Sequence, residues 1–123
     1  MHKCCFANGG GNDLQDVFAP EMVTRLASTI IETGNICKER GVETIFIGGV
    51  PERRYPYTWE RCRDLNGQLK DMCRRNNFIF IDNSGIKHNE HLEFDGVHLN
   101  EMGTRVLANN FLDRLRNEFG VKH

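Results

Sequence analysis

The chain has 123 residues, of which 39% are hydrophobic and 27% charged, and its formal net charge is -1 at pH 7. This length fits one domain, and the composition excludes an intrinsically disordered chain, which would carry fewer apolar residues and a larger net charge. Basic and acidic residues are interleaved, so no footprint for nucleic acid emerges, and no apolar run reaches the ~20 residues of a membrane span.

The first half of the chain predicts two strands with a helix between them. Residues 3–8 form a short apolar run followed by glycines, which is typical of a buried strand ending in a loop. Residues 20–40 carry apolar side chains at helical spacing, with Pro20 suited to the first turn and Gly41 to the stop. Residues 43–51, a β-branched and aromatic run that ends in glycines and a proline, predict the second strand.

The loop over residues 52–57 contains Arg53, Arg54, Tyr55 and Tyr57. Such residues can line the mouth of a site. We interpret them as ordinary, solvated loop surface, which is the commoner role of short basic and aromatic runs.

The second half of the chain predicts a helix, a strand and a last helix. Thr58 is suited to cap a helix whose apolar face comprises Cys62, Leu65, Leu69, Met72 and Cys73. Residues 78–82 are an unbroken apolar run ending in Asp82, which fits a strand covered on both faces. Asn100 is placed to cap a helix with an apolar face made by Leu107, Ala108, Phe111, Leu112, Leu115 and Phe119.

This order, β-α-β-α-β-loop-α, predicts a parallel sheet with right-handed crossovers and helices on both faces. Ligands of such sheets bind beyond the carboxyl ends of the strands. The glycine-rich run with Asn12 follows the first predicted strand, and the segment with Asp95 and His98 follows the third. We therefore expect these two segments to converge on one site.

The chemistry of these residues suggests ester hydrolysis. An Asp three residues before a His, as in Asp95 and His98, can hold the imidazole Nδ1 and leave Nε2 facing outward as a general base. Asn12, beside consecutive glycines, offers an amide donor where the backbone can approach a reacting carbonyl closely. The alternatives are purely structural roles: a flexible loop for the glycines, helix capping for Asn12, and a surface histidine beside a turn aspartate for His98 and Asp95.

Taken together, Gly10-x-Asn12-Asp13 and Asp95-x-x-His98, with the continuation to Gly103, resemble the SGNH, or GDSL-like, hydrolases. The resemblance implies a three-layer α/β/α, flavodoxin-like fold and the activity of a serine esterase, lipase or acetylesterase on a small-molecule ester, without cofactor or metal. It implies that Asn12 donates to the oxyanion, that His98 is the general base and acid, and that Asp95 orients His98.

The sequence departs from this family at the nucleophile. The family's catalytic serine lies in a Gly-Asp-Ser block ahead of the Asn-containing block, and no such block occurs in this chain. We therefore expect residues 1–123 to form a single, truncated SGNH-like domain with about three parallel strands, inactive by itself. The two serines are Ser28, placed within a predicted helix, and Ser84, which is either a turn residue or a substitute nucleophile.

Two further expectations follow from truncation. The strand from Lys3 to Asn8 would keep an unpaired edge, so we expect a homodimer through this edge or dependence on further sequence. A non-catalytic remnant of the enzyme, acting as a ligand-binding or assembly module, is the alternative to an esterase. The five cysteines match no zinc-ligand spacing and suggest reduced thiols, and without a signal peptide or transmembrane segment we expect a cytoplasmic chain.

Overall fold

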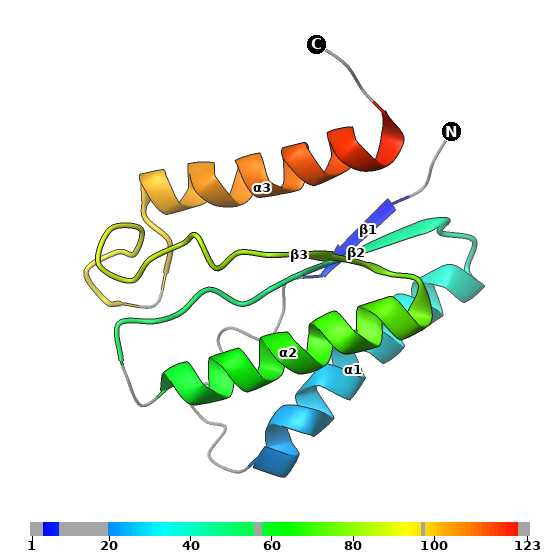
Figure 1. The fold of residues 1–123 in the computed structure, drawn as a ribbon, viewed down its shortest axis with the longest axis horizontal. Helices are drawn as coiled ribbons and strands as arrows, with labels where there is room; N and C mark the ends of the chain where they lie inside the picture. Colours follow the sequence, from blue (N-terminus) through cyan, green and yellow to red (C-terminus); the bar gives the residue numbers. More distant parts are fainter. Residues whose placement is uncertain (1–3, 8–19, 56–57, 97, 121–123) are drawn as a thin grey trace.

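The computed structural model describes residues 4–7, 20–55, 58–96 and 98–120. Its elements are β1 (Cys4–Ala7), α1 (Pro20–Glu39), β2 (Thr44–Gly48), α2 (Trp59–Asn76), β3 (Ile79–Ile81) and α3 (Glu101–Phe119). The strands form one parallel sheet in the order β1-β2-β3. Helices α1 and α2 cover one face of this sheet and α3 lies on the other (Figure 1). The predicted three-layer α/β/α architecture with three parallel strands is confirmed.

Strand β2 is the centre of the molecule because it pairs with β1 on one side and β3 on the other. Ile45, Phe46 and Ile47 are at most 1% exposed. Successive side chains of a strand point to opposite faces. Ile45 and Ile47 therefore join the core under α1 and α2, whereas the Phe46 ring meets the Phe119 ring of α3 edge to face, with 6.2 Å between centroids.

The predicted apolar faces of α1 and α2 are the ones that the fold buries. In α2 these are Cys62, Leu65, Leu69 and Cys73; in α1 they are Val23, Ala27, Ile30 and Ile31. Gly34 lets α1 approach the core closely, since a Cβ there would lie 2.7 Å from Cε2 of Phe78. Burial of the apolar stripes, at roughly 25 cal/mol per Å², provides most of the stability of these helices.

Strand β3 departs from the expectation of a strand covered on both faces. Ile81 is 2% exposed, but Ile79 and Phe80 are only half-buried. The reason is position, because β3 pairs only with β2 and so forms an edge of the described sheet. An unbroken apolar run indicates that a strand is buried but not how completely.

The two predicted helix caps have different outcomes. Asn100 caps α3 as expected, since its Oδ1 accepts from the Gly103 N–H at 2.8 Å. Thr58 occupies the N-cap position of α2, but its hydroxyl makes no cap bond and donates instead to the Tyr55 carbonyl at 2.7 Å. The Thr58 side chain therefore secures the preceding loop rather than the helix end.

Helix α3 is less covered than its pattern predicts. Leu107, Phe111, Leu115 and Phe119 are half-buried, Ala108 and Leu112 are exposed, and Gly103 is the one residue of α3 that is fully buried. Its described contacts include β3 and, through the Phe119 ring, Phe46 of β2, and they leave most of its 19 residues at least partly exposed. None of the described helices is both long and apolar enough to cross a membrane.

Candidate active site

The structure brings Asp95 and His98 together as the sequence predicts. Nδ1 of His98 lies 2.6 Å from Oδ2 of Asp95, and the backbone N–H of His98 donates to Oδ1 of Asp95 at 3.0 Å. An ionised carboxylate only accepts hydrogen bonds, so Nδ1 is the nitrogen that carries the proton. In the neutral imidazole this leaves the lone pair on Nε2, and the side chains are accessible, with 70% of His98 and 49% of Asp95 exposed.

The geometry of this pair is set by a tight turn. The Glu93 N–H donates to the His98 carbonyl at 2.7 Å, and the Gly96 N–H donates to the Glu93 carbonyl at 2.9 Å. Gly96 has φ +74°, a left-handed conformation that glycine adopts without strain. Asn100 ties the base of the turn to the preceding loop, since its Nδ2 donates to the Glu90 carbonyl at 2.9 Å.

The loop between β2 and α2 contacts this turn directly. The Arg54 guanidinium donates to the Glu93 carbonyl at 3.1 Å and to the Phe94 carbonyl, and the Tyr55 hydroxyl donates to the Asp95 carbonyl at 3.1 Å. Arg53 is only 4% exposed. The interpretation of residues 52–57 as ordinary, solvated loop surface is therefore wrong for Arg53; Arg54 and Tyr55 are exposed as expected, but both are hydrogen-bonded to the turn. The sequence signal was there, in a basic and aromatic run after a strand at the ligand-binding end of the sheet.

Ser84 lies beyond the end of β3, as expected, in an exposed turn. Its backbone N–H donates to Oδ1 of Asp82 at 2.8 Å, and this bond, with one from the Ser84 side chain, holds the pKa of Asp82 below its usual value. Ser84 also borders a cavity of about 190 Å³ whose lining includes Trp59, Cys62 and Lys87 but not Asp95 or His98. No described hydrogen bond or cavity joins Ser84 to His98, and its role as a substitute nucleophile stays a prediction.

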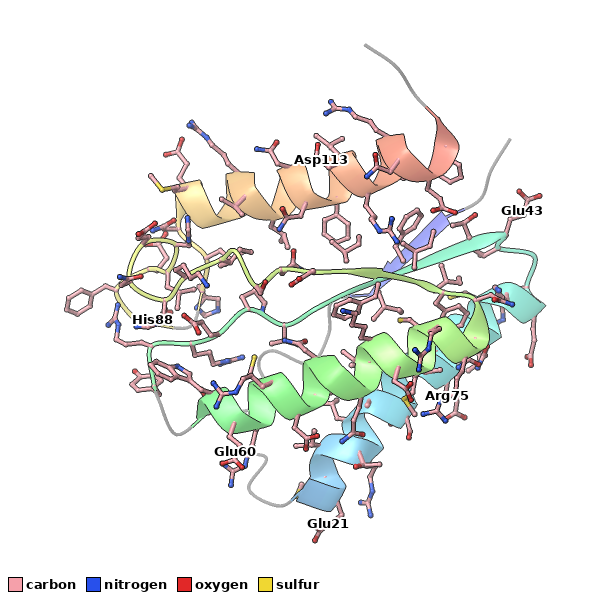
Figure 2. All side chains as sticks on the ribbon, in the orientation of Figure 1. Glu21, Glu43, Glu60, Arg75, His88 and Asp113 are labelled. Atoms are coloured by element: carbon pink, nitrogen blue, oxygen red, sulfur yellow. The ribbon has the colours of Figure 1, made fainter. Side chains whose placement is uncertain are left out.

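A second histidine–carboxylate pair lies beside that cavity. Nδ1 of His88 is 2.8 Å from Oε1 of Glu52, and the His88 ring lies 5.1 Å from the Trp59 ring, centroid to centroid. Figure 2 shows His88 among the loop side chains at the end of the sheet where β2 and β3 finish. Glu52 and His88 are 36 residues apart, so no local spacing signals this pair.

The third histidine of this loop is structural. His91 is 7% exposed, and its Nδ1 accepts the Lys87 N–H at 2.7 Å, which fixes Nε2 as the protonated nitrogen. Within the described part of the chain, no three His, Cys, Asp or Glu side chains gather closely enough to hold a metal ion. Burial raises the pKa of the Cys62 thiol to about 11 and that of Cys73 to about 12, so both are protonated core residues.

The other predicted site residues lie elsewhere. Asn12 and the glycine run before it fall outside the described residues, so the oxyanion role of Asn12 stays a prediction. Ser28 is an exposed residue of α1, as expected for a mid-helix serine.

The fold described above, a parallel sheet between helical layers, is similar to that of two solved structures. The structure is similar to a predicted acylhydrolase of Bacteroides fragilis, with a TM-score of 0.74, 17% identity and 94% of this chain covered. It is also similar to a GDSL-like lipase of Bacteroides thetaiotaomicron, with a TM-score of 0.70, 16% identity and 94% of this chain covered.

The chain spans 62% of the length of each of these two structures. At such low identity the likeness shows the fold. No protein-family model matches the sequence, and a comparison with curated proteins found no match.

Proposed function

We propose that this chain carries the general-base part of an SGNH-type ester hydrolase site, with a small-molecule carboxylic ester as substrate. The observation that supports this proposal best is the 2.6 Å contact between Nδ1 of His98 and the Asp95 carboxylate, which in the neutral imidazole leaves the lone pair on Nε2 of a side chain that is 70% exposed. The fold, shared with a GDSL-like lipase, makes ester hydrolysis the reaction class to which this pair is suited.

In the proposed reaction, Nε2 of His98 takes the proton of a serine hydroxyl as the serine oxygen attacks the ester carbonyl carbon. Asp95 stabilises the imidazolium that forms, and the Asn12 amide donates to the oxyanion of the tetrahedral intermediate. His98 then returns the proton to the departing alkoxide, and a water molecule, deprotonated by His98 in turn, hydrolyses the acyl-serine. Ser28 and Ser84, the two serines of the chain, have no described bond to His98. We therefore infer that the isolated chain is inactive.

The test uses a fluorophosphonate probe and p-nitrophenyl acetate, with intact mass as the readout. It compares the isolated chain with a fusion in which a Gly-Asp-Ser-bearing strand and helix precede residue 1. We expect no stoichiometric adduct on the isolated chain, and an adduct with turnover on the fusion. His98→Ala should abolish both in the fusion. His88→Ala is the matched control, since it removes a histidine–carboxylate pair of similar length from the same loop and should leave both unchanged.

Each other result has a definite meaning. An adduct on the isolated chain that requires both Ser84 and His98 would overturn the inferred inactivity and make Ser84 the nucleophile. A labelled fusion that is insensitive to His98→Ala would overturn the general-base assignment. Ester binding by the fusion without adduct or turnover would favour the alternative, a non-catalytic ligand-binding module.

A further inference from the structure

Two consecutive residues of the loop between β2 and α2 donate hydrogen bonds to the turn that contains Asp95 and His98. Arg54 donates through Nη2 to the Glu93 carbonyl at 3.1 Å, through Nη1 to the Phe94 carbonyl, and through its backbone N–H to the Gly96 carbonyl at 3.1 Å. Tyr55 donates through its hydroxyl to the Asp95 carbonyl at 3.1 Å. Each of the four consecutive backbone carbonyls from residue 93 to residue 96 therefore accepts a hydrogen bond from Arg54 or Tyr55.

The guanidinium is suited to this task by its shape. Its planar fork reaches two neighbouring carbonyls at once, which an ammonium group cannot do with the same rigidity. The Arg54 guanidinium also lies 5.8 Å from the centre of the Phe94 ring, a side chain that is 94% exposed. Gly96 completes the fit, because a Cβ at that position would lie 2.7 Å from Cβ of Arg54.

The loop that contains Arg54 and Tyr55 is itself hydrogen-bonded to the start of α2. The Thr58 hydroxyl donates to the Tyr55 carbonyl at 2.7 Å, and Nε1 of Trp59 donates to the Arg53 carbonyl at 2.8 Å. A continuous set of hydrogen bonds thus runs from the first turn of α2 through Arg54 and Tyr55 to the turn with His98. The His98 side chain is 70% exposed, and this set of hydrogen bonds reaches the turn on which it lies.

We propose that Arg54, assisted by Tyr55, is a positioning residue for the Asp95–His98 pair: its hold on the turn keeps the Asp95 carboxylate on Nδ1 of His98. This inference rests on the proposed function for its catalytic meaning. Arg54 touches backbone carbonyls rather than the reacting atoms, so it acts through the turn. Its substitution should release His98 from Asp95 while leaving the rest of the fold in place.

The test measures which nitrogen of neutral His98 carries the proton, by long-range ¹H–¹⁵N NMR of the ¹⁵N-histidine-labelled chain without substrate. In the unmodified chain we expect the Nδ1–H form to predominate. Arg54→Gln should convert His98 to a mixture richer in the Nε2–H form, and Arg54→Lys should restore part of the Nδ1–H population. Arg74→Gln, which removes an exposed arginine bonded to Asp71 in α2, is the control and should have no effect.

His91 serves as an internal reference, because its Nδ1 accepts the Lys87 N–H and its proton stays on Nε2 in every variant. Should Arg54→Gln fail to fold, Tyr55→Phe removes only the bond to the Asp95 carbonyl and should shift His98 in the same direction. A His98 tautomer unchanged in the folded Arg54→Gln variant, or in Tyr55→Phe in its place, overturns the proposal. Since no substrate is involved, the NMR result is independent of whether the fusion hydrolyses esters.

Discussion

At the scale of single residues, two aspartates act through short-range turns. Asp95 accepts from the backbone and the ring of His98, three residues later, and Asp82 accepts from the backbone N–H of Ser84, two residues later. Both side chains stabilise a loop that follows a strand or precedes α3, and both need an ionised or at least accepting oxygen to do so. The turn after β3 should therefore respond to protonation of Asp82.

Asp82 provides a pH-dependent prediction. Hydrogen bonds from Ser84 lower the pKa of Asp82 in the folded chain. A carboxyl with a lowered folded pKa stabilises the fold above its unfolded pKa, about 3.9, and this contribution is lost as the pH falls through the folded pKa. Asp82→Asn keeps an accepting oxygen but does not titrate. The free energy of unfolding of this variant should therefore fall less steeply than that of the unmodified chain between about pH 5 and pH 2.

The measurement is urea denaturation at a series of pH values. Asp64→Asn is the control, because Asp64 is an exposed residue of α2 that accepts a hydrogen bond from the Gln68 side chain. Parallel pH curves for Asp82→Asn and the unmodified chain would contradict the prediction.

At the scale of elements, the first turn of α3 packs more closely against the rest of the chain than the apolar face of the helix does. The helix begins at the Asn100 cap, and the Asn100 N–H donates to the His91 carbonyl at 2.9 Å. Gly103 faces the same carbonyl at close range, which is why it alone in α3 is fully buried. Two residues before this cap lies His98, so the docking of the first turn of α3 contributes to the position of the candidate base.

Substitution of two helical glycines by alanine tests this docking. A Cβ at Gly103 would lie 2.2 Å from the His91 carbonyl oxygen, whereas no heavy atom lies within 4 Å of a Cβ at Gly67 in α2. Gly103→Ala should lower the free energy of unfolding by about 1–3 kcal/mol or more through overpacking. Gly67→Ala, the matched control, should raise it by about 0.5–1 kcal/mol through helix propensity. Urea denaturation gives both values, and equal effects of the same sign would refute close docking at residue 103.

At the scale of the whole molecule, the described sheet is narrow. Strand β1 pairs with β2, and among the described strands it has no partner at its other edge. On α3, which covers one face of the sheet, Leu112 is 44% exposed. A sheet edge with backbone donors and acceptors to satisfy, beside an incompletely covered helical layer, favours association with another copy or with further chain.

We therefore predict a homodimer through the edge of β1. Sedimentation should give a mass that rises with protein concentration, and the urea midpoint should rise with it, since association stabilises the folded form by mass action. Amide exchange should slow with concentration at Cys4–Ala7 and stay unchanged at Ile79–Ile81 of β3, the other edge. A monomer at all concentrations, with a constant urea midpoint, would rule this dimer out.

The sequence by itself determined the elements and their order, because these depend on periodicity and on contacts within a few residues. The apolar stripes of α1 and α2, the Asn100 cap and the Asp95–His98 pair are all of this kind, the last spanning only three positions. Their residues are neighbours in the chain, so these pairings could be predicted from local spacing.

Only the tertiary structure decided which residues surround that pair. Arg54 lies 40 positions before Phe94, and Glu52 lies 36 positions before His88, distances over which a single sequence carries no pairing information. The same holds for the burial of Arg53 and the partial exposure of α3, which depend on how many elements meet at a surface. Local hydrogen bonding is encoded by spacing, whereas long-range contact is decided by which strand ends the fold places side by side.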